Sequence, residues 1–225
     1  MNKPLTEVRA LPVLRSAADL RQELDARTEP GLLWHPLEAQ RVRCVACAHR
    51  CVIGPGSHGA CGVRRNVDGA LRVPFGYVAR RYVRNVETNT VFHVRPGARA
   101  LTFGMYGCDL RCPYCHNHRI SQALRDGGGD EHPTAITAEK LVEEALTAGC
   151  SVVCAAYNEP MISAEWTHAV FERARQSGLT TALISDGHST PEALTYMRDV
   201  TDVFRVDLKA ATEEGYRKLG GRLAP

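Results

Sequence analysis

Three cysteines lie close together in the middle of the chain, at Cys108, Cys112 and Cys115. Their C-x3-C-x2-C spacing offers three thiolates on one tight loop that follows an apolar, strand-like stretch. A cubane [4Fe–4S] cluster has four irons that each take a terminal ligand, so three cysteines leave one iron open. An open metal position is typical of a reactive site, and a filled one is typical of a structural site. The spacing therefore predicts a reactive iron–sulfur centre.

Half of a zinc knuckle, or surface thiols with no joint role, would also place three cysteines within a short loop. Zinc sites usually use two pairs of ligands that lie far apart in the chain, and this trio, with Tyr114 before its last member, does not have that form. Gly104 and Gly107 let the backbone approach a cluster closely, and Pro113 stops the loop from closing into a helix. These features favour the iron–sulfur interpretation.

A second cysteine group lies in a glycine- and proline-rich segment and consists of Cys44, Cys47, Cys51 and Cys61. Four thiolates are enough to close a tetrahedral site, and both zinc and an iron–sulfur cluster accept them. The spacing does not separate these two metals, His49 or His58 could replace one cysteine, and a disulfide pair is a third alternative. The two remaining cysteines, Cys150 and Cys154, are expected to be buried in or beside an apolar strand.

Strand-like and helix-like apolar patterns alternate beyond residue 100. The pattern predicts strands at 101–106, 151–157, 180–185 and 202–208, and helices at 137–148, 163–177, 190–199 and near 212–219. Such alternation is typical of βαβ units with a parallel sheet, and it places the chain in the α/β class. The predicted organisation is an N-terminal extension (1–40), a Cys-rich and Arg-rich metal-binding module with short strands (41–100), and an α/β core (101–225).

Polar residues follow each predicted strand of the core. The first strand runs into the cysteine loop, and the other three end in Asn158 and Glu159, in Ser185 and Asp186, and in Asp207 and Lys209. Because βα loops gather at the C-terminal ends of parallel strands, we expect these side chains on one face beside the cysteine loop.

The run from Cys108 through Tyr114 to Cys115 resembles the cluster motif of radical S-adenosylmethionine (SAM) enzymes. Residues 89–122 resemble the group that contains pyruvate formate-lyase activating enzyme, and within it the radical SAM proteins of the AmmeMemoRadiSam system. The resemblance runs from about Cys44 to the end of the chain and is strongest at 101–122 and 157–160. It implies a partial (β/α) barrel. Since the pattern supplies about four β/α units, we expect a truncated barrel or one that another polypeptide completes.

The resemblance also implies cofactors and partners. SAM would chelate the open iron of a [4Fe–4S] cluster, and reductive cleavage would yield a 5′-deoxyadenosyl radical that modifies or activates a protein or small-molecule substrate. A glycyl-radical-type partner is one such substrate, and the electron donor would be a protein such as flavodoxin or ferredoxin. Two alternatives remain open: a non-catalytic iron–sulfur or zinc-binding partner subunit, and a nucleic-acid-modifying radical SAM enzyme.

By the same resemblance, Tyr114 would pack beside the adenine of SAM, and Asn158 with Glu159 would hold its amino group. The less favoured alternative for Asn158 and Glu159 is a helix N-cap cluster before Pro160.

Ser185 and Asp186 would contact the ribose or the carboxylate of SAM. Asp186 stands where the family commonly has asparagine. An asparagine side chain both donates and accepts hydrogen bonds, whereas an ionised aspartate only accepts them. Asp207 and Lys209 match an Asp-x-Lys element that would lie near the SAM carboxylate or the substrate, although such a pair is often a surface ion pair.

Composition sets the outer bounds. Hydrophobic residues at 44% and charged residues at 24% are ordinary for a globular protein. The chain has no apolar run of membrane-spanning length and no signal-peptide pattern, so a cytoplasmic protein that binds metal through its nine cysteines is expected. Residues 41–100 hold eleven arginines against Asp68 and Glu87, which indicates either a face for nucleic acid or an acidic partner, or, as favoured, a solvated surface with counter-charges for thiolates.

Overall fold

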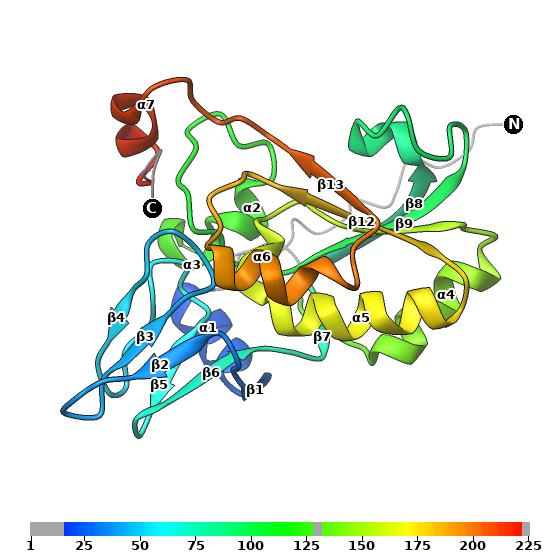
Figure 1. Cartoon of the computed structure of the whole chain (residues 1–225). Coiled ribbons are helices and arrows are strands. Elements are labelled where there is room, and N and C mark those ends of the chain that lie inside the picture. Colours follow the sequence, from blue (N-terminus) through cyan, green and yellow to red (C-terminus); the bar gives the residue numbers. More distant parts are fainter. Residues whose placement is uncertain (1–15, 128–131, 222–225) are drawn as a thin grey trace, which may run out of the picture.

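The structure, a computed structural model, describes residues 16–127 and 132–221 (Figure 1). Residues 1–15 of the predicted N-terminal extension lie outside the described part. The described chain forms a five-stranded sheet covered by helices on one face, with a module of short strands packed against one end (Figure 1).

The central sheet has the order β13-β12-β11-β9-β8. Its strands are β8 (Arg80–Asn85), β9 (Arg99–Gly104), β11 (Val152–Ala155), β12 (Thr180–Ser185) and β13 (Val203–Val206). Strands β9, β11, β12 and β13 are parallel, and β8 pairs antiparallel with β9. The predicted parallel α/β sheet is therefore present. Strand β11 ends before the predicted residue 157, because Tyr157 has a φ of 76° and cannot continue an extended strand.

A helix follows each parallel strand, directly or after a loop: α4 (Ala138–Thr147), α5 (Ala164–Gln176), α6 (Pro191–Arg198) and α7 (Glu213–Lys218). Thr137, Thr190 and Thr212 cap the N-termini of α4, α6 and α7 with their hydroxyl groups. Ser163, at the N-cap position of α5, makes no capping hydrogen bond and donates its hydroxyl to the Pro160 carbonyl at 3.1 Å. The 3-10 turn η2 (Pro160–Ser163) directly precedes α5.

In the structure, the N-terminal module comprises residues 17–74. It contains helix α1 (Ala17–Asp25) and two three-stranded sheets, β1-β6-β5 and β2-β3-β4, so it takes in part of the predicted extension. Its strands are β1 (Thr28–Pro30), β2 (Trp34–Pro36), β3 (Val42–Cys44), β4 (Val52–Ile53), β5 (Arg65–Val67) and β6 (Ala70–Pro74). The remaining short elements are β7 (Tyr77–Val78), which pairs with β10 (Thr134–Ala135), and the helices η1 (Val86–Asn89), α2 (His118–Ser121) and α3 (Ala123–Asp126).

One large hydrophobic cluster unites the module with the helix-covered face of the sheet. It runs from Leu20 and Val42 in the module to Phe103 and Leu183 in the sheet and Trp166 in α5. A smaller cluster packs Val86 and Val91 against alternate residues of the strands, on the opposite face. No helix among the described residues is long and apolar enough to cross a membrane.

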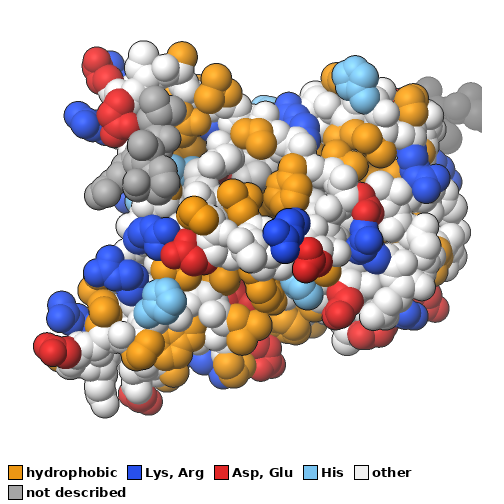
Figure 2. Space-filling model, in the orientation of Figure 1, with side chains coloured by type: hydrophobic (Ala, Val, Ile, Leu, Met, Phe, Trp, Pro, Cys, Tyr) orange, Lys and Arg blue, Asp and Glu red, His pale blue; other side chains and the backbone are white. Residues whose placement is uncertain are grey.

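Acidic residues from outside the Arg-rich segment neutralise part of its charge. Figure 2 shows basic and acidic side chains close together on the module, at the lower left. The ion pairs are Arg50–Glu192, Arg64–Glu165, Arg65–Asp25 and Arg81–Glu144. These arginines thus hold the module and the sheet to acidic groups of the same chain.

The Arg64–Glu165 pair is buried between module and core, and its loss should be costly. The guanidinium meets the carboxylate at 2.7 and 2.8 Å, and Glu165 also accepts the amide N–H groups of Leu32 and Leu33. Arg64→Leu should lower the free energy of unfolding by about 3–5 kcal/mol, because it leaves a buried carboxylate without its counter-ion. Urea unfolding of Arg64→Leu, Glu165→Leu and the double variant checks this. A double variant as unstable as the sum of both single ones would contradict the pairing.

Candidate active site

The cysteine loop begins where β9 ends and runs to α2. Cys108, Cys112 and Cys115 are free thiols and all are half-buried. The Cys115 Sγ lies 3.4 Å from the Ser121 hydroxyl, which closes the loop against α2. The three predicted ligands thus share one loop at the C-terminal edge of the parallel sheet.

Hydrogen bonds to its carbonyl groups hold the backbone of this loop in place. Arg125 donates to the carbonyls of Cys108 at 2.8 Å and Leu110 at 3.1 Å, and the Gln122 amide also donates to Leu110 at 2.9 Å. The Arg111 backbone amide donates to the Leu219 carbonyl at 2.7 Å. A loop fixed through its carbonyls presents its side chains in a constant arrangement.

The donor set fits an iron–sulfur cluster with one open iron. Burial, and then the negative charges of Asp109 and Asp186, hold the pKa of Cys108 well above its usual range. Burial also raises the pKa of Cys112, which Lys209 opposes. Thiolates in such surroundings need a cationic metal centre to stabilise them, and three sulfurs leave one position of a cubane for another ligand.

The strand ends after β11 and β12 meet at Glu159. Its buried carboxylate accepts the hydroxyl of Ser185 at 3.0 Å, the amide N–H of Asp186 at 2.7 Å and that of Met161 at 2.9 Å. The Asn158 side-chain oxygen accepts the Met105 amide N–H at 3.0 Å, immediately before the cysteine loop. The structure therefore brings four predicted residues from two strand ends together beside the predicted cluster ligands.

Three carboxyl groups, those of Asp109, Glu159 and Asp186, crowd this region. Burial, and then Asp109, raise the pKa of Glu159 to about 7. Burial, and then Glu159 and Asp109, hold the pKa of Asp186 well above its usual range. A cysteine sulfur and two carboxylates, from Cys108, Asp109 and Asp186, all lie within 4.8 Å of one another. Such a concentration of buried anionic groups would be relieved by a bound cation such as an ammonium group.

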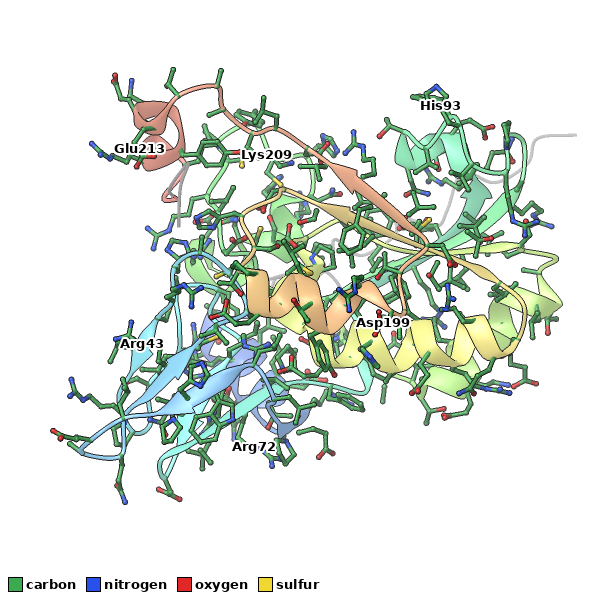
Figure 3. All side chains as sticks on the ribbon, viewed as in Figure 1. Arg43, Arg72, His93, Asp199, Lys209 and Glu213 are labelled. Atoms are coloured by element: carbon green, nitrogen blue, oxygen red, sulfur yellow. The ribbon has the colours of Figure 1, made fainter. Side chains whose placement is uncertain are left out.

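The third strand end lies over the same loop. The Lys209 ammonium donates to Asp207 at 3.1 Å, Arg205 also pairs with Asp207, and the Tyr114 hydroxyl donates to the Lys209 carbonyl at 2.7 Å. Figure 3 shows Lys209 beyond the end of β13, on the way to α7. The predicted Asp207–Lys209 element is thus both an ion pair and a neighbour of Tyr114, whose ring is exposed.

The sequence does not reveal a buried histidine–aspartate pair beneath the loop. The His188 Nδ1 lies 2.8 Å from the Asp109 carboxylate, and His49 Nε2 lies 3.0 Å from the Asp109 carbonyl. Asp109 and His188 are both buried. Their positions, directly after Cys108 and two residues after Asp186, are the only sequence signal that could have drawn attention to them.

The second cysteine group lies in the module, close to the cysteine loop. Cys44, Cys47 and Cys61 are buried, Cys51 is half-buried, and none of the four is in a disulfide. His58, one alternative ligand, pairs with Asp25 at 2.8 Å, and His49 contacts Asp109. Cys150 and Cys154 are buried free thiols, as expected.

Gly107, in the cysteine loop, lies against the backbone of Cys61 in the second cysteine group. A side chain at Gly107 should therefore disturb both groups. Its φ is 86°, and a Cβ atom would lie 2.6 Å from the Cys61 carbonyl oxygen. Gly149, after α4, has a φ of 68° with open space around it, so it serves as a matched control. Gly149→Ala should cost about 1–2 kcal/mol from backbone strain alone, and Gly107→Ala clearly more. Urea unfolding measures the loss of stability in both variants. Equal losses would contradict the close contact between Gly107 and the Cys61 backbone.

Comparison with known proteins identifies the family. The sequence profile of the radical SAM superfamily matches residues 103–224, which is more than half of the chain. The chain therefore belongs to the radical SAM superfamily, and this membership implies a [4Fe–4S] cluster and SAM. The superfamily prediction is confirmed.

Named relatives indicate which group of radical SAM proteins this chain resembles. The chain is 31% identical to pyruvate formate-lyase 1-activating enzyme of Escherichia coli strain K12 over 134 residues, covering 56% of this chain and 51% of that protein. It is 27% identical to pyruvate formate-lyase-activating enzyme of Clostridium pasteurianum, covering 56% and 52%. These matches confirm the predicted likeness to the activating-enzyme group. The assignment to the AmmeMemoRadiSam system stays a prediction.

Two further proteins are similar to this chain, and neither similarity assigns an activity to it. An uncharacterized protein of Methanocaldococcus jannaschii is 29% identical over 191 residues, covering 84% of this chain and 55% of that protein. The crystal structure of QueE from Escherichia coli matches with a TM-score of 0.37 and 12% identity, covering 50% of this chain and 53% of that one. The chain spans about half the length of the curated relatives it matches.

Proposed function

We propose that this protein is a radical SAM enzyme of the activating-enzyme type. Cys108, Cys112 and Cys115 hold the cluster, and the ends of β11, β12 and β13 bind SAM beside it. The observation that carries this proposal is the meeting of the Cys108 sulfur with the Asp186 carboxylate, which in turn neighbours Glu159, at the edge where the parallel strands end.

Each side chain has a role that its surroundings support. Glu159 and Asn158 bind the amino group of SAM, since Glu159 is a buried carboxyl group beside other acidic side chains, which a cationic group would stabilise in their ionised form. Lys209, which lies near Cys112, attracts the SAM carboxylate. Tyr114 gives the adenine a flat apolar surface. The bound cluster supplies the electron for reductive cleavage of SAM to a 5′-deoxyadenosyl radical.

The relatives suggest the kind of substrate. Two of them are named for the activation of pyruvate formate-lyase, so a protein substrate is proposed for this chain as well. A small redox protein, such as flavodoxin or ferredoxin, would supply the electron.

The proposal is tested by product formation. Protein reconstituted with iron and sulfide without oxygen, then reduced with dithionite, should convert SAM to 5′-deoxyadenosine and methionine, measured by liquid chromatography and mass spectrometry. Omitting dithionite should stop the reaction. Protein that carries its iron and binds SAM but yields neither product would refute the proposal and favour a non-catalytic metal-binding subunit.

A further inference from the structure

We propose that the N-terminal cysteine group, Cys44, Cys47, Cys51 and Cys61, binds a second iron–sulfur cluster with four thiolate ligands. These residues all precede the region that matches the radical SAM profile, which begins at residue 103. The site is therefore additional to the cofactor site of the proposed function.

The fold of the module brings the four sulfurs into one region. Strands β3 and β4 pair in the register Val42↔Ile53 and Arg43↔Val52, which sets Cys44 directly opposite Cys51. The Cys44 amide N–H donates to the Cys51 carbonyl at 2.9 Å, and Cys47 lies in the connection between them. Cys61 approaches from the following loop, whose Ala60 amide donates to the Cys51 sulfur at 3.4 Å.

Backbone amides are aimed at these sulfurs. The donors are the amide of His49 to Cys47, that of Ala60 to Cys51, and those of Val63 and Arg64 to Cys61. An N–H group stabilises a negatively charged thiolate much more than a neutral thiol, because a hydrogen bond to an ionised acceptor is the stronger one. The loops are thus built around thiolates, which is the state in which cysteine binds metal.

Positive charge lies next to the group as well. Arg125 donates to the carbonyls of Ala60, Cys108 and Leu110 and to the side-chain oxygen of Gln122. None of these hydrogen-bond partners is a carboxylate, and the guanidinium charge is attracted by Cys108, Cys61 and Asp109. A guanidinium shared in this way fits two anionic metal–thiolate centres side by side.

Zinc is the alternative occupant of the group. A Zn–S bond of about 2.3 Å places the sulfurs of a tetrahedral zinc site about 3.8 Å apart. Among the described residues, no three of the four sulfurs all lie within 4.8 Å of one another. The thiols are therefore not held at the spacing of a tetrahedral zinc site, and a cluster is the proposed occupant.

The test removes the ligands of the radical SAM cluster and measures the iron and sulfide that the protein still binds. In the full chain, Cys108, Cys112 and Cys115 are all replaced with alanine, and the protein is reconstituted with ferrous iron and sulfide without oxygen. We expect about four irons and four sulfides per chain in this triple variant. Adding Cys44→Ser and Cys61→Ser should reduce the iron to background, whereas adding Cys150→Ser and Cys154→Ser should leave it unchanged.

Folding is checked in parallel, because Cys44 and Cys61 are buried. Circular dichroism follows each variant, and Cys51→Ser, at the least buried position, replaces the pair if the pair unfolds. One zinc and no iron per chain in the triple variant would overturn the cluster, and so would the absence of both metals. Either result leaves the proposed function intact, since that is measured by SAM cleavage in the unmutated protein.

Discussion

Replacing Cys112 with alanine should abolish the formation of 5′-deoxyadenosine from SAM. Cys112 is one of three thiols on a loop whose backbone is fixed by other groups, so no neighbouring sulfur of the loop can take its place. Loss of one of three ligands leaves the cluster unstable or wrongly open. The measurement is product formation under reducing, oxygen-free conditions, and we expect product only at the level of a sample without protein.

Cys150→Ala makes the same chemical change at a buried cysteine outside both cysteine groups. This control should retain the activity of the unmutated protein. Unchanged product formation by Cys112→Ala would rule out the assigned cluster ligands.

Replacing Glu159 with glutamine should weaken SAM binding by about 10- to 100-fold. The change keeps the shape of the side chain but removes the charge that pairs with the SAM ammonium, and a hydrogen bond to a charged group is worth about 1.5–3 kcal/mol. Equilibrium binding of SAM to the reconstituted protein measures the loss. Glu144→Gln, which alters a carboxylate paired with Arg81 on the far helix α4, should bind SAM normally. Equal affinities for both variants would contradict the role of Glu159.

The affinity for SAM should also depend on pH through Glu159. Burial and Asp109 raise its pKa to about 7, so at pH 6 only about a tenth of the carboxyl groups are ionised. SAM should therefore bind about tenfold more weakly at pH 6 than at pH 8, and Glu159→Gln should lose this dependence.

Stability without SAM should change in the opposite direction. A carboxyl group whose pKa is raised in the folded state contributes stability at low pH that is lost as the pH rises through about 7. Thermal unfolding of the SAM-free protein checks this sign, because the contribution of Glu159 should grow as the pH falls from 8 to 6.

Local patterns were sufficient to predict the core of the fold. Strand 180–185 matches β12 to the residue, and helix 137–148 matches α4 within one residue at each end. These elements have a clear hydrophobic period and are bounded by threonine caps or glycine, so neighbouring residues alone determine them. The polar strand ends were predictable for the same reason, since parallel strands place their C-terminal ends at one edge.

Contacts between distant segments were not predictable from these patterns. Arg64 and Glu165 are 101 residues apart, and Asp109 and His188 are 79 apart, so neither pair leaves a periodic signal. The early end of β11 depends on the left-handed backbone of Tyr157, which Gly104 accommodates: a Cβ there would lie 2.5 Å from the Ala156 carbonyl oxygen. Tertiary contacts of this kind override local preference.

The central claim is that three cysteines leave one iron open and that SAM occupies it. The most direct measurement is the electron paramagnetic resonance spectrum of the dithionite-reduced, reconstituted protein, recorded with and without saturating SAM. Binding at the open iron predicts a reduced-cluster signal whose g values shift when SAM is added, and no shift in Cys112→Ala. A signal that is identical with and without SAM would contradict the account.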